Sequence, residues 1–274
     1  MSLPKKIPIK TSKKVLGMSD TQKNTLKNTQ KKEDGPKEIQ LQLSDKKKFF
    51  DLSDSILNNL RFTDVSLYSS TPTDQAKYTT ELLLNYYSKE DLKTKILMDA
   101  TACIGGNTWV FADYVKQVIA NELSKLHAEI LESNMKAIGK NNIDVSNDNY
   151  LNIYLTTKQD IIFFDPPWGG IDYKQASEVE IQLLDVNGMP KKLDEIILGL
   201  LQYRCETLLL KLPVNYPIKK IIDNCTFVNI DDLVINAIDG KPLYRLVVLS
   251  HLPRLSTPIT KTFPRLGYKT IVPI

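Results

Sequence analysis

Short apolar segments alternate with amphipathic segments along residues 96–249, and this alternation restricts the possible folds more than any other feature of the sequence. The apolar segments have the length of buried strands, and the segments between them carry apolar residues at helical spacing. Strands that alternate with helices form a mainly parallel sheet with helices on both faces. The expected strands are Ile96–Met98, Val118–Ala120, Ile161–Phe164, Thr207–Leu210, Phe227–Ile230 and Leu246–Leu249, and the expected helices cover residues 107–115, 123–138, 193–203 and 217–224.

We therefore predict an α/β fold with a Rossmann-like, doubly wound sheet of about seven strands. No long helical segment separates the last two strands, so we expect an antiparallel hairpin at the edge of the sheet. In folds of this class, ligands bind outside the carboxyl ends of the parallel strands. The residues that follow each predicted strand are therefore the first candidates for a functional site.

The first 48 residues differ in composition from the rest of the chain. They contain 13 lysines and five acidic side chains, a net charge of +8, whereas residues 49–274 carry a net charge of −4. A segment with so few aliphatic residues buries too little apolar surface to offset the entropy lost on ordering, so we predict a disordered tail over residues 1–48. Such a basic arm can also attract RNA or carry a localisation signal.

Residues 49–88 are predicted to form a helical extension that covers the active site, ahead of a catalytic domain at residues 89–274. Apolar residues recur at helical spacing in two parts of the extension, with a polar stretch between them. Thr71 is expected to cap the second helical part, and Pro72 is expected at its first position.

Cysteine and histidine content excludes several classes of protein. The three cysteines lie far apart and there are only two histidines, so we expect neither a disulfide framework nor a metal site. His127 is expected on a solvated helix face, and His251 in a structural role. No apolar run approaches the ~20 residues that cross a bilayer. We expect an intracellular protein of the nucleus or cytoplasm, monomeric and without membrane contact.

A glycine turn follows the first predicted strand and opens the next helix. The strand ends at Asp99, and Gly105, Gly106, Asn107 and Thr108 lead into the helix. The glycines allow close approach of the backbone to a ligand. Asp99 would repel a pyrophosphate but suits a ligand with an amine, so this motif favours a nucleoside ligand without phosphate.

Carboxylates also follow the next strands. Glu122 ends the second strand, 23 residues after Asp99, where a carboxylate can accept both hydroxyls of a ribose. Asp148, which follows Ile143 and Val145, is a candidate for the adenine amino group. An adenosine with a cationic centre and no phosphate corresponds to S-adenosylmethionine, which we therefore predict as the cofactor.

The most specific motif is Asp165-Pro166-Pro167-Trp168, at the end of an apolar strand in the middle of the sheet. The two prolines stiffen the backbone and leave carbonyl groups that can accept a hydrogen bond from an exocyclic amine. Asp165 adds a carboxylate acceptor, and the indole of Trp168 offers a flat face on which a base can stack. The motif thus predicts methyl transfer to a nucleobase amine.

With these residues together, the chain resembles the class I S-adenosylmethionine-dependent methyltransferases, and within them the trimethylguanosine synthases, which methylate the guanine N2 of an RNA cap. The resemblance covers about residues 62–252. It rests on Ser69-Ser-Thr-Pro72, Asp99-Ala-x-x-x-x-Gly-Gly-Asn-Thr108, Glu122, Asn134, Asp148 and Pro166-Pro-Trp-Gly-Gly-x-Asp-Tyr173. The compact chain further indicates a minimal or viral version that acts in a host cytoplasm.

The resemblance implies a capped RNA, or a cap analogue, as the binding partner, and it implies a role for each matching residue. The methionine end of the cofactor would contact Asp99, Asn107 and Thr108, with Glu122 at the ribose and Asp148 at the adenine. Further cofactor contacts are expected from Thr71, Thr101, Gly105 and Asp165. Lysines before Ser69 would meet the cap phosphates. Catalysis is expected from Asp165, Pro166 and Trp168, and contacts with the 7-methylguanine base from Trp168, Pro167, Asn134 and Asn215.

Two positions depart from the pattern of this family. Asp165 stands where the family usually has serine, and Asp-Pro-Pro-Trp is also the signature of adenine-N6 methyltransferases. Leu212-Pro-Val214-Asn215 stands where the family has Leu-Pro-Arg-Asn, which removes one phosphate contact. An adenine-N6 enzyme acting on DNA or RNA, and an inactive cap- or RNA-binding subunit with the same fold, therefore remain alternatives.

Overall fold

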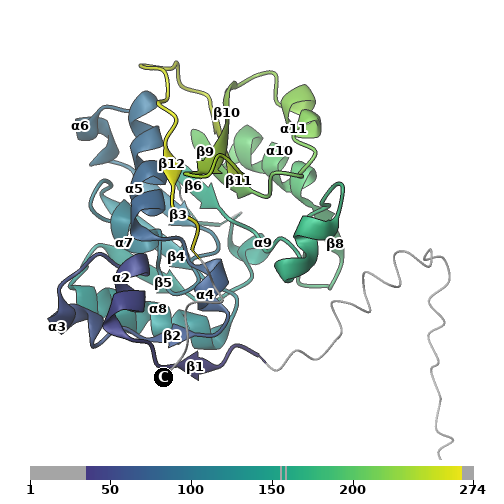
Figure 1. The fold of residues 1–274 in the computed structure, drawn as a ribbon. Helices are drawn as coiled ribbons and strands as arrows, with labels where there is room; N and C mark the ends of the chain where they lie inside the picture. The colour runs from purple at the N-terminus through teal and green to yellow at the C-terminus, as the bar shows by residue number, and fades with distance from the viewer. Residues whose placement is uncertain (1–34, 155, 158, 267–274) are drawn as a thin grey trace, which may run out of the picture. The chain divides into compact units, whose positions relative to one another are not determined.

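Eight hydrogen-bonded strands form the central sheet of the computed structural model, which describes residues 35–154, 156–157 and 159–266 (Figure 1). Within this sheet β11 runs antiparallel to both of its neighbours, and the other neighbouring pairs are parallel. The predicted Rossmann-like α/β fold is thereby confirmed, with eight strands and not about seven. In their order across the sheet the strands are β12 (Thr262–Phe263), β10 (Asn229–Ala237), β11 (Pro242–Ser250), β9 (Thr207–Leu212), β6 (Ile161–Phe164), β3 (Ile96–Asp99), β4 (Gln117–Asn121) and β5 (Ile143–Ser146).

The predicted antiparallel hairpin is formed by β10 and β11, but two other strands of the central sheet, β5 and β12, were not predicted. In β5 the apolar residues Ile143 and Val145 alternate with polar residues, because β5 lies at the edge of the sheet. A sequence with this alternation resembles an exposed segment, so the strand was not predicted. β12 has only two residues. The predicted strand Phe227–Ile230 begins later, at Asn229, and the side chain of Phe227 is 45% exposed.

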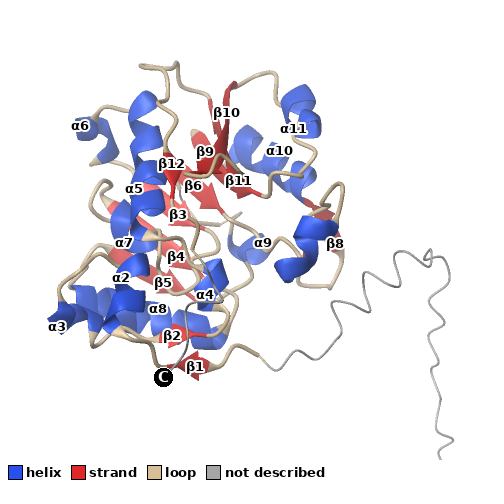
Figure 2. Ribbon diagram, viewed as in Figure 1, coloured by secondary structure: helices blue, strands red, loops and turns tan. Residues whose placement is uncertain are grey.

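Helices cover both faces of the sheet and enclose two separate apolar cores (Figure 2). On one face α5, α7 and α8 pack with the N-terminal segment, and on the other face α10 and α11 pack on β6, β9 and β11. The helices are α2 (Leu43–Phe49), α3 (Asp54–Leu57), α4 (Ser66–Ser69), α5 (Thr73–Glu81), α6 (Lys89–Leu92), α7 (Thr108–Phe111), α8 (Lys125–Ile138), α9 (Tyr150–Ile153), α10 (Leu193–Tyr203) and α11 (Lys219–Asn224), with 3-10 helices η1 (Leu82–Asn85) and η2 (Gly170–Gln175).

The folded part of the chain begins earlier than the predicted boundary at residue 49. Strand β1 (Glu38–Ile39) pairs with β2 (Phe62–Thr63), and helix α2 begins at Leu43. The ammonium group of Lys46 is buried and donates hydrogen bonds to the carbonyls of Leu57 and Leu60 at 2.9 and 2.7 Å. The prediction of a disordered tail is therefore wrong for residues 38–48, and residues 1–34 lie outside the described residues.

Helix α5 begins one residue later than predicted. Pro72 is extended and occupies the capping position, and Thr73 is the first helical residue. The side chain of Thr71 consequently does not cap the helix; its hydroxyl accepts hydrogen bonds from two other side chains of the candidate site, described below.

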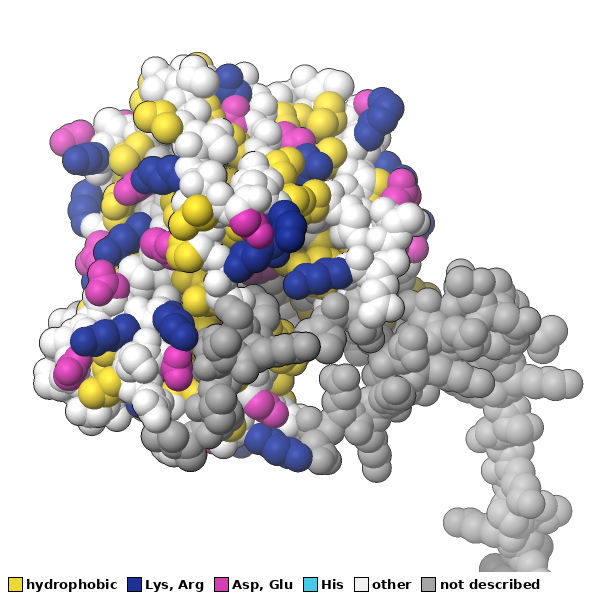
Figure 3. All heavy atoms as spheres, in the orientation of Figure 1, with side chains coloured by type: hydrophobic (Ala, Val, Ile, Leu, Met, Phe, Trp, Pro, Cys, Tyr) yellow, Lys and Arg dark blue, Asp and Glu magenta, His cyan; other side chains and the backbone are white. Residues whose placement is uncertain are grey.

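The surface of the described residues carries charges of both signs. Figure 3 shows lysine and arginine side chains interspersed with acidic ones over one face of the molecule.

A second small hairpin, β7 (Gln182–Leu184) with β8 (Pro190–Lys192), follows η2. No helix in the described part of the chain has the length and apolar character to cross a membrane.

Candidate active site

The candidate site lies where the strand order reverses. From β3 the chain continues to β4 and β5 on one side and to β6 and β9 on the other, and such switch points are the usual ligand-binding positions of open α/β sheets. Asp99 ends β3, Asp165 directly follows β6, and Lys211 lies near the end of β9. The sheet thus brings these three charged residues to the same edge.

Asp99 is almost fully buried at the end of β3 and accepts a hydrogen bond from the hydroxyl of Thr108 at 2.6 Å. The second carboxylate oxygen of Asp99 has no partner among the described residues, and neither has the buried amide oxygen of Asn107. Buried acceptors without a partner are rare, because they lose hydration without gaining a hydrogen bond. These two oxygens therefore mark a place for a ligand with N–H donors.

The pKa of Asp99 is raised to about 7, chiefly by burial and also by the nearby carboxylates of Asp165 and Glu122, while the hydrogen bond from the Thr108 hydroxyl opposes this rise. Three carboxylates so close together repel each other as long as no cation lies between them. This concentration of negative charge is suited to a positively charged ligand.

Glu122 follows β4, and both of its carboxylate oxygens accept backbone N–H groups. One oxygen accepts from Cys103 at 2.9 Å and the other from Ser124 at 2.8 Å. The carboxylate is thus held rigidly beside the glycine turn, with lone pairs left to accept further donors. Asp148, predicted near the adenine, uses one oxygen to accept from the backbone of Asn149 and the side chain of Asn152.

The turn between β3 and α7 is built by close backbone packing. Gly105 has a φ of 99°, which favours glycine, and Cys103 also has a positive φ of 50°. At Gly106 a β-carbon would lie 2.8 Å from the carbonyl oxygen of Thr71. The N-terminal extension therefore packs directly on this turn, where Asn107 donates to the Thr71 hydroxyl at 2.9 Å.

Asp165 forms an ion pair with Lys211, which was not among the predicted site residues. The ammonium of Lys211 lies 2.8 Å from the Asp165 carboxylate and donates to the Thr71 hydroxyl at 2.9 Å. The backbone of Asp165 is fixed as well, since Thr101 donates to its carbonyl at 2.9 Å and accepts from its N–H at 3.1 Å. The predicted strand Thr207–Leu210 ended one residue before Lys211, whereas β9 extends to Leu212 and Lys211 is its one charged residue.

Trp168 is partly buried beside this ion pair. Its indole N–H donates to the carbonyl of Lys211 at 3.3 Å, and Tyr173 packs edge-on against its ring with centroids 5.2 Å apart. Pro166 is buried, whereas Pro167 is exposed. The ring is therefore held in a defined orientation while part of its surface stays accessible, as a stacking platform requires.

Asn215, predicted as a base contact, lies in the loop after β9 and stabilises the segment that follows Trp168. Its amide donates to the carbonyls of Tyr173 and Ala176 at 2.9 and 2.8 Å, while its own amide oxygen is buried and lacks a partner among the described residues. The amide oxygen is the one group of Asn215 left to contact a ligand, and we retain the predicted contact for that oxygen.

The prediction that Asn134 contacts the base is wrong. Its side chain is completely buried, and, unlike the side chains of Asp99 and Asn107, it has no polar atom left without a hydrogen-bond partner. The amide oxygen accepts the backbone N–H of Arg61 at 2.9 Å, and the amide nitrogen donates to the carbonyls of Arg61 and Ile104. Asn134 therefore ties the N-terminal segment and the glycine turn to α8.

We expect Asn134→Ala to lower the free energy of unfolding by about 2–3 kcal/mol, because it leaves the partly buried N–H of Arg61 and the carbonyls of Arg61 and Ile104 without the hydrogen bonds of this buried side chain. Urea unfolding measures this loss. Asn59→Ala, which removes one exposed hydrogen bond to Ser55, is the control and should stay within about 0.5 kcal/mol. An unchanged stability combined with weaker substrate binding would restore the base-contact role.

His127 is not solvated, contrary to the prediction. Its side chain is buried and its Nε2 lies 2.8 Å from the hydroxyl of Thr63 in β2, so the N-terminal segment covers the helix face on which it lies. His251 contacts the carbonyl of Leu201 through Nε2 at 2.7 Å. Among the described residues, no group of three or more His, Cys, Asp or Glu side chains is arranged to hold a metal ion.

Comparison with known proteins assigns the family. The sequence model of the RNA cap guanine-N2 methyltransferases matches residues 94–253, more than half of the chain, including β3 to β11 and all the strand-end residues described above. The chain belongs to this family. The resemblance predicted from the sequence motifs is thus confirmed.

One curated relative is an uncharacterized protein of Acanthamoeba polyphaga mimivirus. The two are 34% identical over 137 residues, which are 48% of this chain and 51% of the relative, so the match spans about half the length of each. Among solved structures, a precorrin-6y C5,15-methyltransferase of Geobacter metallireducens is 11% identical, with 66% of this chain and 90% of that chain covered and a TM-score of 0.47. An rRNA methylase of Streptococcus thermophilus is 14% identical, with 66% and 95% covered and a TM-score of 0.42.

Proposed function

We propose that this member of the RNA cap guanine-N2 methyltransferase family transfers a methyl group from S-adenosylmethionine to the exocyclic N2 of 7-methylguanosine in an RNA cap. The observation that carries the proposal is the arrangement of Asp165, Pro166 and Trp168 beside Asp99 at the switch point of the sheet. It combines acceptors for an amine, a ring for stacking and an acidic site for a cationic cofactor.

The residues at the end of β3 fit S-adenosylmethionine. The unpartnered oxygens of Asp99 and Asn107 can accept hydrogen bonds from its ammonium group, and the acidic surroundings favour its net positive charge. Glu122 would accept the ribose hydroxyls, and Asp148 would lie toward the adenine. Gly105, Thr71, Thr101 and Thr108 would complete the wall of this site.

Trp168 would bind the base, with Pro167 and the amide oxygen of Asn215 nearby. Methylation at N7 makes guanine cationic, so stacking on the indole gains a cation–π contribution of roughly 0.5–2 kcal/mol over unmethylated guanine. Because the charge of Lys211 is balanced by Asp165 at 2.8 Å, it does not repel the base strongly. The site would therefore prefer 7-methylguanine over guanine.

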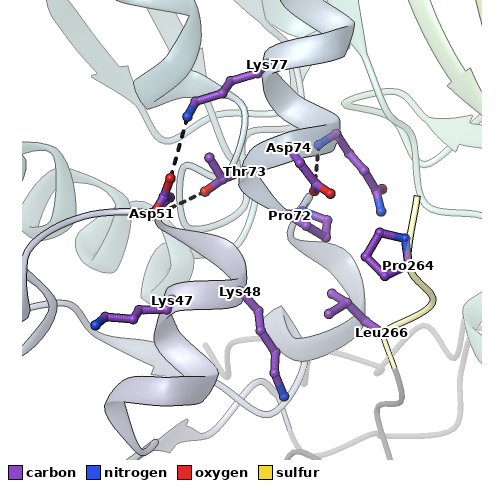
Figure 4. A pocket seen from close by; sticks show the side chains of 10 residues that line it. Lys47, Lys48, Asp51, Pro72, Thr73, Asp74, Lys77, Pro264 and Leu266 are labelled. Carbon is purple, nitrogen blue, oxygen red and sulfur yellow. Dashed lines mark hydrogen bonds and ion pairs between the residues drawn. The ribbon is translucent and has the colours of Figure 1, made fainter. Parts of the chain in front are cut away.

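Lysines of the N-terminal segment would contact the cap phosphates. Lys47, Lys48 and Lys77 line a cavity of about 310 Å³ whose wall includes Pro72, the residue after Thr71 (Figure 4). Each of these lysines is paired with an acidic side chain, Lys47 with Asp54 at 2.8 Å, Lys48 with Asp45 at 2.7 Å and Lys77 with Asp51 at 3.7 Å, so a phosphate would compete with these exposed or partly exposed pairs. In this proposal residues 49–88 cover the active site, as the sequence predicts. A few lysines, and not a broad basic surface, would then bind the cap phosphates.

S-adenosylmethionine, when bound, supplies an electrophilic methyl group. The amine at N2 is a weak nucleophile because its lone pair is delocalised into the ring. Asp165 and the Pro166 carbonyl would accept its N–H groups, which localises the lone pair and stabilises the positive charge that develops on nitrogen. Trp168 would fix the base at the correct distance, and such positioning contributes several kcal/mol to the barrier reduction. The released proton can pass to Asp165 or to water.

Competition with free 7-methyl-GTP separates the proposed function from the alternatives. We expect 7-methyl-GTP to inhibit methylation of capped RNA or to be methylated itself, and GTP to do so far less. An adenine-N6 enzyme, which Asp165 alone would also suit, would ignore 7-methyl-GTP and label adenine. A chain that binds 7-methyl-GTP but shows no calorimetric binding of S-adenosylmethionine would be an inactive binding subunit.

A further inference from the structure

Lys211 lies at an unusual place for a lysine, inside the sheet and beside the candidate site. Phe164 of β6 pairs with Leu210 of β9. The residues that follow them, Asp165 after the end of β6 and Lys211 within β9, therefore lie at the same level of the sheet. Only 8% of Lys211 is exposed. A buried ammonium costs several kcal/mol in lost hydration, which a fold tolerates when the group is paired and hydrogen-bonded.

We propose that Lys211 is a positioning residue, whose ammonium group holds the Asp165 carboxylate ionised and oriented as the acceptor for the amine that receives the methyl group. The inference rests on the proposed function and assigns a role to a residue outside the motifs on which the resemblance rests. Lys211 also accepts the indole N–H of Trp168 through its carbonyl at 3.3 Å. One residue of β9 thus fixes both the acceptor and the stacking ring.

The charges around Asp165 explain why a cation is needed there. Asp99 at the end of β3, Cys103 in the glycine turn and Tyr244 on β11 face the same space, and the Asp165 charge disfavours their ionised forms. Burial raises the pKa of Asp165, and Lys211 opposes this rise through its charge and its hydrogen bond. Without Lys211, a larger fraction of Asp165 would be protonated, and the neutral carboxylic acid accepts a hydrogen bond from an amine less well than the carboxylate does.

The remaining neighbours keep the ammonium in place. The Thr71 hydroxyl accepts from it at 2.9 Å, and it lies 5.2 Å from the ring centroid of Tyr244 and 5.8 Å from that of Trp168. Thr71 belongs to the N-terminal extension, so the extension and the sheet hold Lys211 from two sides. A side chain restrained in this way orients its carboxylate partner at little further entropic cost.

The first test uses Lys211→Met and Lys211→Gln, which remove the charge, and Lys211→Arg, which keeps it. On this proposal we expect the acidic limb of the wild-type kcat profile to report ionisation of Asp165, with activity lost as pH falls through the pKa of this group. Loss of the Lys211 charge raises that pKa, so we expect the limb to move upward by about one pH unit or more in both neutral variants and to stay near its wild-type position in Lys211→Arg. Lys95→Met, which breaks the Lys95–Glu206 pair at the other end of β9, is the matched control and should leave the limb unchanged.

A double-mutant cycle asks whether Lys211 acts through Asp165. We expect Lys211→Met and Asp165→Asn each to reduce kcat by about 30-fold or more, and the double variant, which carries no unpaired buried charge, to be within about threefold of Asp165→Asn. A further loss in the double variant equal to that of Lys211→Met alone would overturn the proposal, because Lys211 would then act independently of Asp165.

A measurement without substrate distinguishes failure of this inference from failure of the proposed function. In protein with 13C-labelled aspartate carboxyl groups, the Asp165 signal is identified by its absence in Asp165→Asn. We expect this signal to titrate at higher pH in Lys211→Gln than in the wild type. Identical titrations would refute the role of Lys211 even if the cap is methylated, whereas a shifted titration in a protein that does not methylate the cap would refute only the proposed function.

Discussion

Trp168→Ala is expected to lower methylation of 7-methyl-GTP by about 100-fold or more while binding of S-adenosylmethionine changes by less than about threefold. Base stacking on an aromatic side chain contributes roughly 1–3 kcal/mol and the cation–π interaction roughly 0.5–2 kcal/mol, and both are lost with the indole. The cofactor contacts that we propose for Asp99 and Glu122 do not involve Trp168. Steady-state kinetics gives the first quantity and titration calorimetry the second.

Trp168→Phe is the matched control, because it keeps a flat ring without the indole N–H that donates to Lys211. We expect it to retain an intermediate activity. The chain has two tryptophans, and the other, Trp109, is buried in α7, so fluorescence quenching by 7-methyl-GTP should come from Trp168 and vanish in both variants. Simultaneous loss of cofactor binding in Trp168→Ala would argue against a stacking role, since it would indicate a general collapse of the site.

Asp99→Asn is expected to weaken binding of S-adenosylmethionine by about 30- to 100-fold, since a hydrogen bond between charged groups contributes roughly 2–3 kcal/mol. The amide would keep the contact with Thr108 but lose the charge that attracts the cation. Titration calorimetry measures the loss. Asp113→Asn is the control and should bind normally, because Asp113 is an exposed residue of the turn after α7, where it pairs with Lys140.

The pKa of Asp99 predicts how cofactor binding depends on pH. Burial raises this pKa to about 7, so the group is increasingly protonated below neutral pH and its attraction for a cation is lost. The affinity of the wild type for S-adenosylmethionine should therefore fall as pH decreases below about 7, by an amount that approaches tenfold per pH unit. The affinity of Asp99→Asn should not change over the same pH range. An equally flat wild-type profile would mean that the ionised form of Asp99 does not take part in binding.

The parts of the site that follow from strand ends could be predicted from the sequence. Parallel strands place their carboxyl ends at one edge, so Asp99 and Asp165 had to lie near each other once the strands were identified. The apolar character of β3, β6 and β9 made that identification straightforward, because these central strands are buried on both faces. The edge strand β5 was not predicted, because only one of its faces packs on the core.

Other side chains could not be placed because segments distant in sequence bury them. Lys46, His127 and Asn134 are polar residues on helices and resemble solvated positions. Their partners are Leu60, Thr63 and Arg61, 14, 64 and 73 residues away, in a segment whose packing on α8 has no local pattern. The pairing of Lys211 with Asp165 likewise depends on the neighbouring positions of β6 and β9, which local sequence does not determine.

The most direct measurement for the proposed function is incubation of the full chain with S-adenosylmethionine carrying a labelled methyl group, together with 7-methyl-GTP or GTP, followed by digestion and nucleoside analysis. We expect label in N2-methylated 7-methylguanosine and little or none with GTP. Label in adenosine when RNA or DNA is supplied, or no label in 7-methylguanosine under conditions in which the cofactor binds, would contradict the proposed function.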